Sequence, residues 1–187
     1  LPMDDYESLS ELRSYSRVPI AGGELHSSGQ VEFDTMLEKG CYDIYQPDAI
    51  FTGGISQTFE IAKKCLKKGV SYTPHTWTNG IGFAVNLQLM AASGFSSTME
   101  LEYPVSPPGW TVPSRDAILE TPFTHDKGTL QLPTLPGLGF NINRKILKKY
   151  GKRFFNMDKK RLIWFSIRTR GVKISKEIDH IKRKKKN

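Results

Sequence analysis

Hydrophobic and polar positions follow two alternating patterns over the first 104 residues. Short apolar runs, typical of buried strands, alternate with longer stretches in which apolar residues recur at helical spacing. The runs cover residues 18–21, 42–47, 70–74 and 98–101. The helical stretches cover about 6–15, from Ser27 or Ser28 to Gly40, from Gly54 to Gly69, and 80–93. Because parallel neighbouring strands need a crossover helix between them, this alternation predicts parallel βα units.

The helical stretches differ in how they should be covered. Asp4 or Asp5 can cap the first, and Val31 is expected on the apolar side of the second. The third has the clearest spacing, with apolar residues at i, i+4, i+7 and i+11 (Ile55, Phe59, Ala62 and Leu66). The stretch at 80–93 is apolar almost all round, so it should be covered by other parts of the protein.

An ionisable residue closes each apolar run. These residues are Glu24, Asp48, His75 and Glu102, at intervals of 24, 27 and 27 residues. A βα unit takes about 30 residues, so the four side chains should lie at the same ends of consecutive strands. In a (β/α)8 barrel that rim carries the active site. The spacing therefore indicates one candidate site.

The chemistry of the four residues suits acid–base catalysis. Asp48 and His75 are on neighbouring strands, and a carboxylate bonded to one ring nitrogen fixes the imidazole tautomer and raises its basicity. Glu24 is a hard oxygen donor suited to Mg²⁺, although a single carboxylate is not a site. Glu102 could donate a proton or hydrogen bond to a developing oxyanion, with Glu100 as an alternative on the same strand side.

Each of these residues could also have an ordinary structural role. Taken singly, Glu24 suits a surface or capping position, Asp48 a turn, and His75 a satisfied polar side chain. Their shared register favours the joint interpretation. The other histidines do not fall at strand ends in this repeat, and they are expected to be structural or surface residues (His26, His125 and His180). Cys41 and Cys65 lack metal-ligand spacing and are expected to be buried and reduced, as in the cytoplasm.

Length and charge divide the chain. It has 187 residues, whereas a complete (β/α)8 barrel takes about 250. The net charge of +8 is unevenly spread: residues 144–187 carry 18 Lys and Arg against 3 acidic residues, or +15, and residues 1–143 carry −7. A basic tail can bind nucleic acid or an anionic membrane, or it can be a solvated helix. With no aromatic platform or nucleic-acid motif beside the charge, the solvated helix is favoured.

Beyond Pro104 the pattern becomes irregular. Residues 105–155 are rich in Pro and Gly and are expected to form a meander, with a helix over about 143–150. A second helix should start near Lys159 in the basic tail at 156–187. No apolar run approaches the roughly 20 residues of a membrane span, so no membrane partner is expected. These features give three expected segments, at 1–104, 105–155 and 156–187.

The ordered motifs around the four residues resemble the enolase superfamily, in the mandelate racemase / muconate lactonizing enzyme family. The motifs are Pro19-Ile20-Ala21-Gly22-Gly23-Glu24, Gln46-Pro47-Asp48 with Gly53-Gly54-Ile55, Pro74-His75-Thr76-Trp77, and Leu101-Glu102-Tyr103-Pro104. The resemblance covers about residues 1–155. The muconate-lactonizing branch has a Lys within the stretch that reads Ala49-Ile50-Phe51-Thr52 here, so the mandelate racemase and sugar-acid dehydratase side is the better match.

The resemblance implies a fold and a set of roles. The fold would be the C-terminal half of a TIM-type (β/α)7β barrel, followed by the meander and C-terminal helices. Glu24 would be a ligand of Mg²⁺. His75 would be the base that removes the proton α to a substrate carboxylate, with Asp48 as its partner and Glu102 as the acid. The other metal ligands and a Lys base would belong to an N-terminal half that this sequence lacks.

The activity implied is that of a Mg²⁺-dependent dehydratase acting on an acid sugar, in a homo-oligomer. A racemase or epimerase of a hydroxy acid is the nearest alternative. A different alternative is a non-catalytic half-barrel that binds a partner through its basic tail. By itself the 187-residue chain is expected to be inactive, and nucleic acid is not an expected partner.

Overall fold

The computed structural model describes residues 1–153 and 158–184. The chain divides into two compact units, Leu1–Lys149 and Tyr150–Asn187. The expected boundary at 155 falls among residues 154–157, which lie outside the described part. Lys185 and Lys186 of the basic end also lie outside it. The expected boundary at 104 remains a prediction.

Three parallel strands form the sheet of the first unit. They are β1 (Ala21–Gly22), β2 (Ile44–Tyr45) and β3 (Ser71–Tyr72), paired in the order β1-β2-β3. Ala21 pairs with Ile44, and Ile44 with Ser71, so the strands are in register. An α/β fold with parallel strands is confirmed. The strands are shorter than the apolar runs that predicted them.

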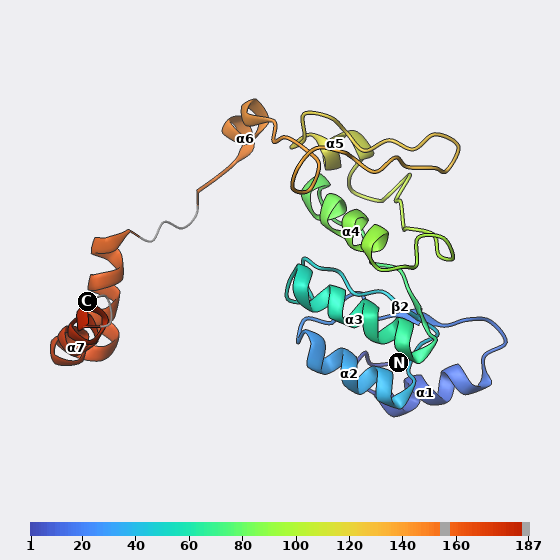
Figure 1. Ribbon diagram of the computed structural model, residues 1–187, viewed down its shortest axis with the longest axis horizontal. Helices are drawn as coiled ribbons and strands as arrows, with labels where there is room; N and C mark the ends of the chain where they lie inside the picture. Colours follow the sequence, from blue (N-terminus) through green and yellow to red (C-terminus); the bar gives the residue numbers. More distant parts are fainter. Residues whose placement is uncertain (154–157, 185–187) are drawn as a thin grey trace. The chain divides into compact units, whose positions relative to one another are not determined.

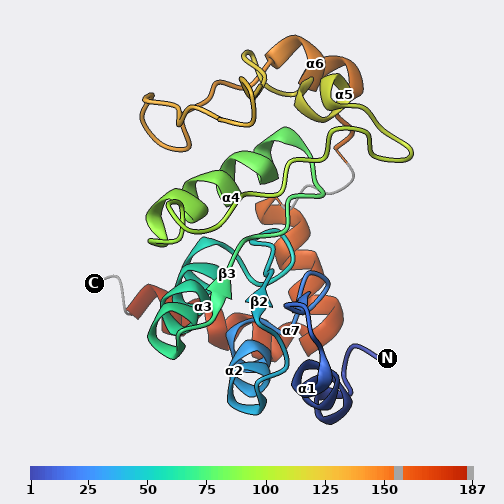
Figure 2. The same ribbon diagram turned by 90° about the vertical axis from the view of Figure 1, so that its right-hand side faces the viewer.

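Four helices alternate with these strands. They are α1 (Tyr6–Tyr15), α2 (Gln30–Lys39), α3 (Ile55–Lys68) and α4 (Gly80–Ala92). Figures 1 and 2 show α2, α3 and α4 following one another alongside the strands. Asp5 caps α1 by accepting a hydrogen bond from the Ser8 amide, and Gly40 and Gly69 end α2 and α3, all as predicted.

Several local expectations are wrong. Neither Ser27 nor Ser28 caps α2; Gly29 precedes the helix, and the Ser28 amide instead donates to the Glu32 side chain. Val31 is exposed, because α2 buries the side that carries Phe33, Met36 and Leu37. On α3 the buried face is rotated from the expected one. It consists of Thr58, Ile61, Ala62 and Cys65, so that Ile55 and Leu66 are about half exposed.

Residues 98–101 are not a strand, contrary to expectation. Side chains of the β3 segment hold this part of the chain in place of a ladder of backbone hydrogen bonds. The Thr73 hydroxyl donates to the Glu100 carbonyl at 2.6 Å, and the Thr76 hydroxyl donates to the Glu102 carbonyl at 2.6 Å. The segment therefore runs beside β3 and ends at Glu102.

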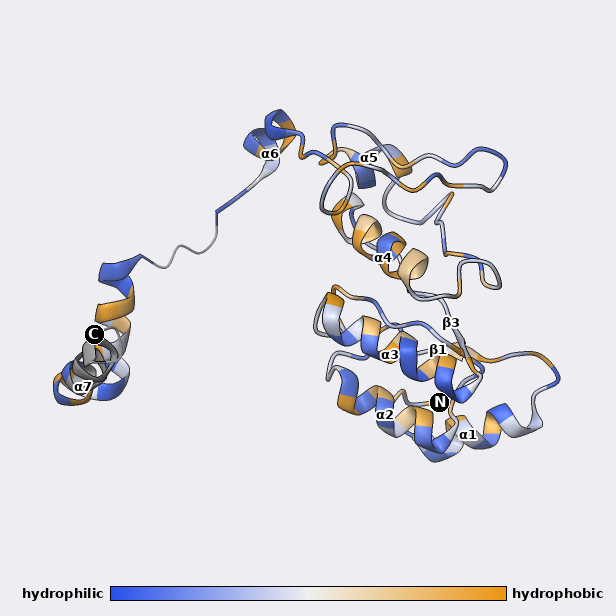
Figure 3. Cartoon of the chain, viewed as in Figure 1, coloured by the Kyte–Doolittle hydropathy of each residue, from blue (hydrophilic) through white to orange (hydrophobic). Residues whose placement is uncertain are grey.

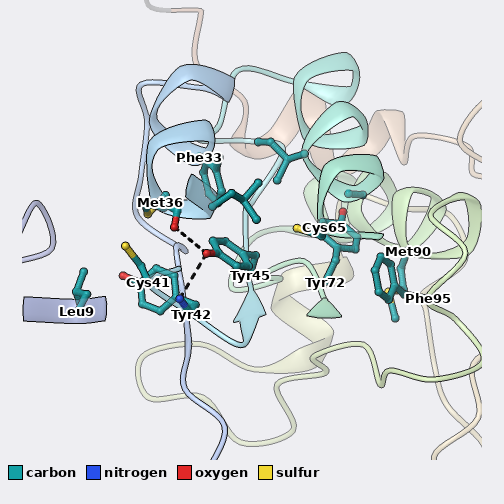
Figure 4. Close-up of a cluster of buried hydrophobic side chains, with 13 residues drawn as sticks. Leu9, Phe33, Met36, Cys41, Tyr42, Tyr45, Cys65, Tyr72, Met90 and Phe95 are labelled. Atoms are coloured by element: carbon teal, nitrogen blue, oxygen red, sulfur yellow. Dashed lines mark hydrogen bonds between the residues drawn. The ribbon is translucent and has the colours of Figure 1, made fainter. Parts of the chain in front are cut away.

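The main core lies between the strands and α1, α2 and α3 (Figure 4). Tyr45 and Tyr72, on β2 and β3, are fully buried there. The Tyr45 hydroxyl donates to the Met36 carbonyl at 2.9 Å and so satisfies its polar tip within the core. Cys41 and Cys65 are buried and free, as predicted. A second cluster around Phe83 and Leu87 of α4 covers the apolar helix with Leu119 and Phe123.

Three further helices follow α4 in the described residues. They are α5 (Val112–Asp116), α6 (Arg144–Tyr150) and α7 (Lys159–Lys184). Gly171 interrupts α7 with non-helical backbone angles. Between α5 and α6 the chain is irregular, and an antiparallel bridge joins Leu119 to Ile142. Residues 117–143 are called the meander below. In the described part of the chain, every helix is too short or too polar to cross a membrane.

Candidate active site

The centre of the site is a histidine–carboxylate pair. His75 follows β3 and Asp48 follows β2, and the parallel register brings the two side chains together. His75 Nδ1 lies 3.1 Å from Asp48 Oδ2. Asp48 is fully buried, and the His75 side chain is 10% exposed. An ionised carboxylate can only accept, so this contact places the ring proton on Nδ1 and leaves the Nε2 lone pair available.

Asn86, from the middle of α4, fixes this pair from behind. Its Nδ2 donates to Asp48 Oδ1 and to the His75 carbonyl, both at 2.8 Å. Its Oδ1 accepts from the Ala49 amide at 3.2 Å. The backbone amide of Ile50 also donates to Asp48 Oδ1, at 2.9 Å. The buried carboxylate therefore has donors at both oxygens, which offsets the cost of removing its charge from water.

Glu24 stands on the other side of His75. It follows β1 after Gly23, whose φ of 103° lies in the left-handed region that favours glycine, so the chain can turn sharply there. Glu24 Oε2 lies 3.9 Å from His75 Nε2, and the Glu24 side chain is 49% exposed. The open nitrogen of the imidazole therefore faces a partly solvated carboxylate.

Glu102 reaches the same rim from the segment after α4. Its Oε2 accepts a hydrogen bond from the Thr76 amide at 2.6 Å. Because Thr76 is the residue after His75, this bond fixes the Glu102 carboxylate beside the backbone that carries the imidazole. Thr76 itself is fully buried.

A buried ion pair braces the chain next to Glu102. Arg115 on α5 makes two 2.7 Å contacts to Asp116, and neither side chain is exposed. The Arg115 guanidinium lies 4.7 Å from the centre of the Tyr103 ring and 4.4 Å from that of Phe83. The Tyr103 hydroxyl donates to the Phe123 carbonyl at 2.7 Å. Tyr103 is thereby held between α4, α5 and the meander, with Glu102 adjacent to it in sequence.

The net effect of the surroundings raises the pKa of His75 above its usual 6.5. Burial alone would lower that pKa, since it disfavours the charged ring. The hydrogen bond to Asp48 and the negative charges of Glu102, Asp48 and Glu24 outweigh burial. The imidazole is consequently a stronger base than a free histidine.

The donor set of the described residues does not make a complete metal site. Within residues 1–153 and 158–184, no group of three or more His, Cys, Asp or Glu side chains is placed to hold an ion. Glu24 is a partly exposed carboxylate at the rim, but Asp48 is enclosed and already bonded. The geometry thus offers Mg²⁺ one oxygen ligand, fewer than its usual coordination requires.

All four residues singled out from the sequence lie at this rim. The other histidines do not join them: His26 is buried against Glu32, with Nδ1 2.6 Å from Oε1, and His125 packs edge-on against Tyr103. The side chain of His180 lies outside the described part. A cavity of about 620 Å³ between α4 and the meander contains none of the four residues, whereas Glu24 lines one of about 390 Å³ beside β1.

Sequence reasoning missed Asn86 and Thr76. The signal for Asn86 was present, since it is a polar residue in the middle of a helix that is apolar almost all round. A buried amide in such a helix needs polar partners, and in the structure these are Ala49, Asp48 and His75.

Comparison with known proteins accounts for most of the chain. A family model described as "Enolase C-terminal domain-like" matches residues 1–146. The chain belongs to this family. The resemblance expected from the motifs, to the mandelate racemase / muconate lactonizing enzyme family and its sugar-acid dehydratases, is confirmed for this part of the chain.

Two curated relatives illustrate the match. The D-galactarolactone cycloisomerase of Agrobacterium fabrum is 31% identical over 155 residues, which cover 79% of this chain and 39% of the relative. The arabinonate dehydratase of Saccharolobus solfataricus is 33% identical over 147 residues, covering 78% and 37%. The chain therefore spans less than two fifths of the length of these relatives.

Solved structures agree on the fold. The 3,6-anhydro-D-galactonate cycloisomerase of Zobellia galactanivorans superimposes with a TM-score of 0.68 at 28% identity, over 80% of this chain and 40% of that one. The L-talarate dehydratase of Polaromonas sp. JS666, a complex with Mg and L-glucarate, has a TM-score of 0.64 at 21% identity, over 80% and 37%. This enolase-type fold joins parallel strands and helices, as observed here.

Proposed function

We propose that this chain carries the His–Asp base of an enolase-superfamily dehydratase that removes the proton α to the carboxylate of an acid sugar. The observation that carries the proposal is the His75–Asp48 contact of 3.1 Å, with Asp48 fully buried and His75 Nε2 directed to the rim. The relatives support the class of reaction and substrate, because they are dehydratases and cycloisomerases of sugar acids and their lactones.

His75 would perform the proton transfer. Its Nδ1–H stays on Asp48, so Nε2 accepts the α proton: the C–H bond breaks, an N–H bond forms at Nε2, and the electron pair moves toward the substrate carboxylate as an enolate. The imidazolium that results is stabilised by the carboxylate of Asp48. The electron pair of the enolate then expels the β-hydroxyl group, which takes the proton from Nε2 of the His75 imidazolium and leaves as water, and the imidazole returns to its neutral form.

Glu102 would act on the developing negative charge. Its Oε2 is held by the Thr76 amide at 2.6 Å, which leaves Oε1 to carry a donated proton or hydrogen bond. Glu24 is proposed as one carboxylate ligand of Mg²⁺, with the remaining ligands supplied from outside this chain.

The fold is proposed to be half of a larger barrel. The three parallel strands and the segment ending at Glu102 would form the C-terminal half of a TIM-type (β/α)7β barrel. Support comes from the coverage of only 37–39% of the curated relatives named above. The missing N-terminal half, whether joined or separate, would supply the other ligands and a second base, and the isolated chain is expected to be inactive.

The test joins residues 1–153 to the part of the arabinonate dehydratase that precedes the matched region. The chimera and the isolated chain are incubated in D₂O with D-arabinonate, D-gluconate or D-galactonate, and α-proton exchange and loss of water are followed by NMR. The chimera should exchange and dehydrate at least one acid, and the isolated chain none. His75→Asn and Glu24→Gln should each lower exchange by a factor of about 10² or more.

Glu102→Gln keeps an acceptor for the Thr76 amide and removes the acid. It should slow α-proton exchange and dehydration alike, because both pass through the enolate on which Glu102 would act. Exchange in the His75→Asn chimera equal to that of the unsubstituted chimera would rule out the base assignment.

Cycloisomerisation is a second candidate, favoured by the Agrobacterium relative at 31% identity. It shares the α-proton transfer at His75, so the same D₂O assay with a sugar-acid lactone distinguishes it by its product. A racemase or epimerase would need a second base facing the opposite side of the substrate carbon. The described residues at this rim offer His75 as the only imidazole.

A further inference from the structure

The first part of α7 has an unusual composition for a solvated helix. Asp158 starts it by accepting the Arg161 amide at 2.8 Å. The next turns carry five apolar residues within six positions, and each is 39–60% exposed (Leu162, Ile163, Trp164, Phe165 and Ile167). Figure 3 shows hydrophobic residues directly after a hydrophilic first turn. Trp164 and Phe165 therefore lie among the basic residues of the tail.

Positive charge surrounds this apolar stretch. Lys159 and Lys160 precede it, and Arg168 and Arg170 follow it. Arg161 and Arg168 are seven residues apart and so share one side of the helix, while the apolar residues between them occupy positions 162–165 and 167 in its middle turns. The Arg168 guanidinium lies 5.1 Å from the centre of the Trp164 ring, which keeps a cation beside the aromatic group.

The family does not account for this segment. The family match ends at residue 146, before this segment begins. The non-helical backbone at Gly171 (φ 79°) ends the first part of α7 at residue 170. That part is about 18 Å long, at 1.5 Å per residue, which is too short to span a bilayer but sufficient to lie on one.

We propose that residues 159–170 bind the surface of an anionic lipid bilayer. Trp164, Phe165 and their aliphatic neighbours would enter the headgroup region, and the flanking Lys and Arg side chains would contact lipid phosphate and carboxylate groups. Trp and Arg suit that depth, because each combines an apolar body with a polar tip. The proposal replaces the sequence-based expectation that no membrane is a partner.

Two other possible partners fit residues 159–170 less well. Nucleic acid offers the same negative charge, but consecutive Leu and Ile side chains have no counterpart on its phosphate backbone. A second copy of the chain could cover the apolar residues, but it would bring together two tails of +15 each. A lipid surface matches both the apolar stretch and the charge.

The test uses the full 187-residue chain with Trp77→Phe and Trp110→Phe, which leaves Trp164 as the only tryptophan. It is mixed with vesicles of phosphatidylcholine alone or with 30% phosphatidylserine. Co-sedimentation and a blue shift of Trp164 fluorescence are expected only with phosphatidylserine, and both should weaken as salt is raised.

Two variant pairs separate charge from apolar contact. Lys159→Gln with Lys160→Gln should weaken partitioning roughly thirtyfold; Lys67→Gln with Lys68→Gln, an equal loss of exposed charge on α3, should not. Ile163→Ala with Phe165→Ala should weaken it at least tenfold, and Leu132→Ala with Leu135→Ala, exposed apolar residues of the first unit, should not.

Three outcomes would overturn the proposal. One is the absence of binding to phosphatidylserine vesicles at low salt. Another is binding unaffected by Ile163→Ala with Phe165→Ala, which would indicate attraction by charge alone. The third is binding to a 20-nucleotide DNA that persists when vesicle binding is absent. Circular dichroism of each variant, matched to the parent chain, confirms that losses do not come from unfolding.

Discussion

At the scale of single residues, the site depends on one amide inside an apolar helix. Asn86 bonds both members of the His75–Asp48 pair, so its loss should lower stability as well as disturb the geometry of the pair. Asn86→Leu leaves the His75 carbonyl and the Ala49 amide without this partner. The free energy of unfolding should fall by about 1–3 kcal/mol, as measured by urea denaturation. Gln88→Leu, a polar residue on the same helix that is not buried, serves as the control.

The pKa of His75 should depend on Asp48 more than on distant charges. In the folded chain that pKa is raised above 6.5, so His75 stabilises the fold at low pH, and this contribution is lost as pH rises through the folded-state pKa. NMR titration of the His75 ring should show the raised value. Asp48→Asn should lower the pKa of His75, because burial still lowers that pKa while the negative charge of Asp48 no longer raises it.

Asp34→Asn is the matched control for that titration. Asp34 pairs with Lys64 and is not among the charges that act on His75. An Asp48→Asn chain with an unshifted His75 pKa would contradict the assigned contact. In the chimera, proton exchange should rise with pH through the His75 pKa, since only the neutral ring can accept the α proton.

Sequence spacing placed Glu24, Asp48, His75 and Glu102 at one rim because strand ends recur with the βα repeat, and a repeat is visible without coordinates. It could not show which of them touch. Three details depend on side-chain rotamers: the Asp48–His75 contact, the 3.9 Å distance from His75 to Glu24, and the hydrogen bond from the Thr76 amide to Glu102. The first also depends on Asn86, which comes from a helix later in the chain.

At the scale of elements, the first strand depends on the absence of a side chain at Gly22. A Cβ there would lie 2.4 Å from Cε1 of Tyr42, which is buried. Gly22→Ala should therefore lower the free energy of unfolding by about 1–3 kcal/mol through overpacking. In a double-mutant cycle with Tyr42→Leu, the smaller residue should restore part of that loss. Purely additive effects would show that the two positions do not interact.

Helix existence was predictable and helix orientation was not. The bounds of α1 and the glycine ends of α2 and α3 follow from local signals. The buried face of α3 does not, because Ile61 and Cys65 turn inward toward β3 while Ile55 and Leu66 remain half exposed. Similarly, the apolar run at 98–101 suggested a fourth strand, but threonine side chains, which no periodicity detects, hold that segment instead.

At the scale of the molecule, β1 forms an open edge of the sheet. The adjacent cavity of about 390 Å³, which Glu24 also lines, has a mostly apolar lining that includes Leu9, Ile20 and Tyr42. An uncovered edge and apolar cavity should make the isolated chain bind the dye ANS and unfold at lower temperature than the chimera. Equal melting temperatures, with no ANS binding by the isolated chain, would argue against a missing covering segment.

The two thiols have a further use. Cys41 and Cys65 have no exposed surface, and burial raises the pKa of the Cys65 thiol to about 12, so neither should react with an alkylating reagent while the fold is closed. Cys65 lies within α3 and Cys41 directly after α2. At a maleimide concentration high enough for labelling to outpace reclosing, the rate at which each thiol is labelled should therefore equal the rate at which that layer opens. Mass spectrometry of the labelled peptides would measure those openings separately, so the two native thiols serve as independent probes of local unfolding at α2 and at α3.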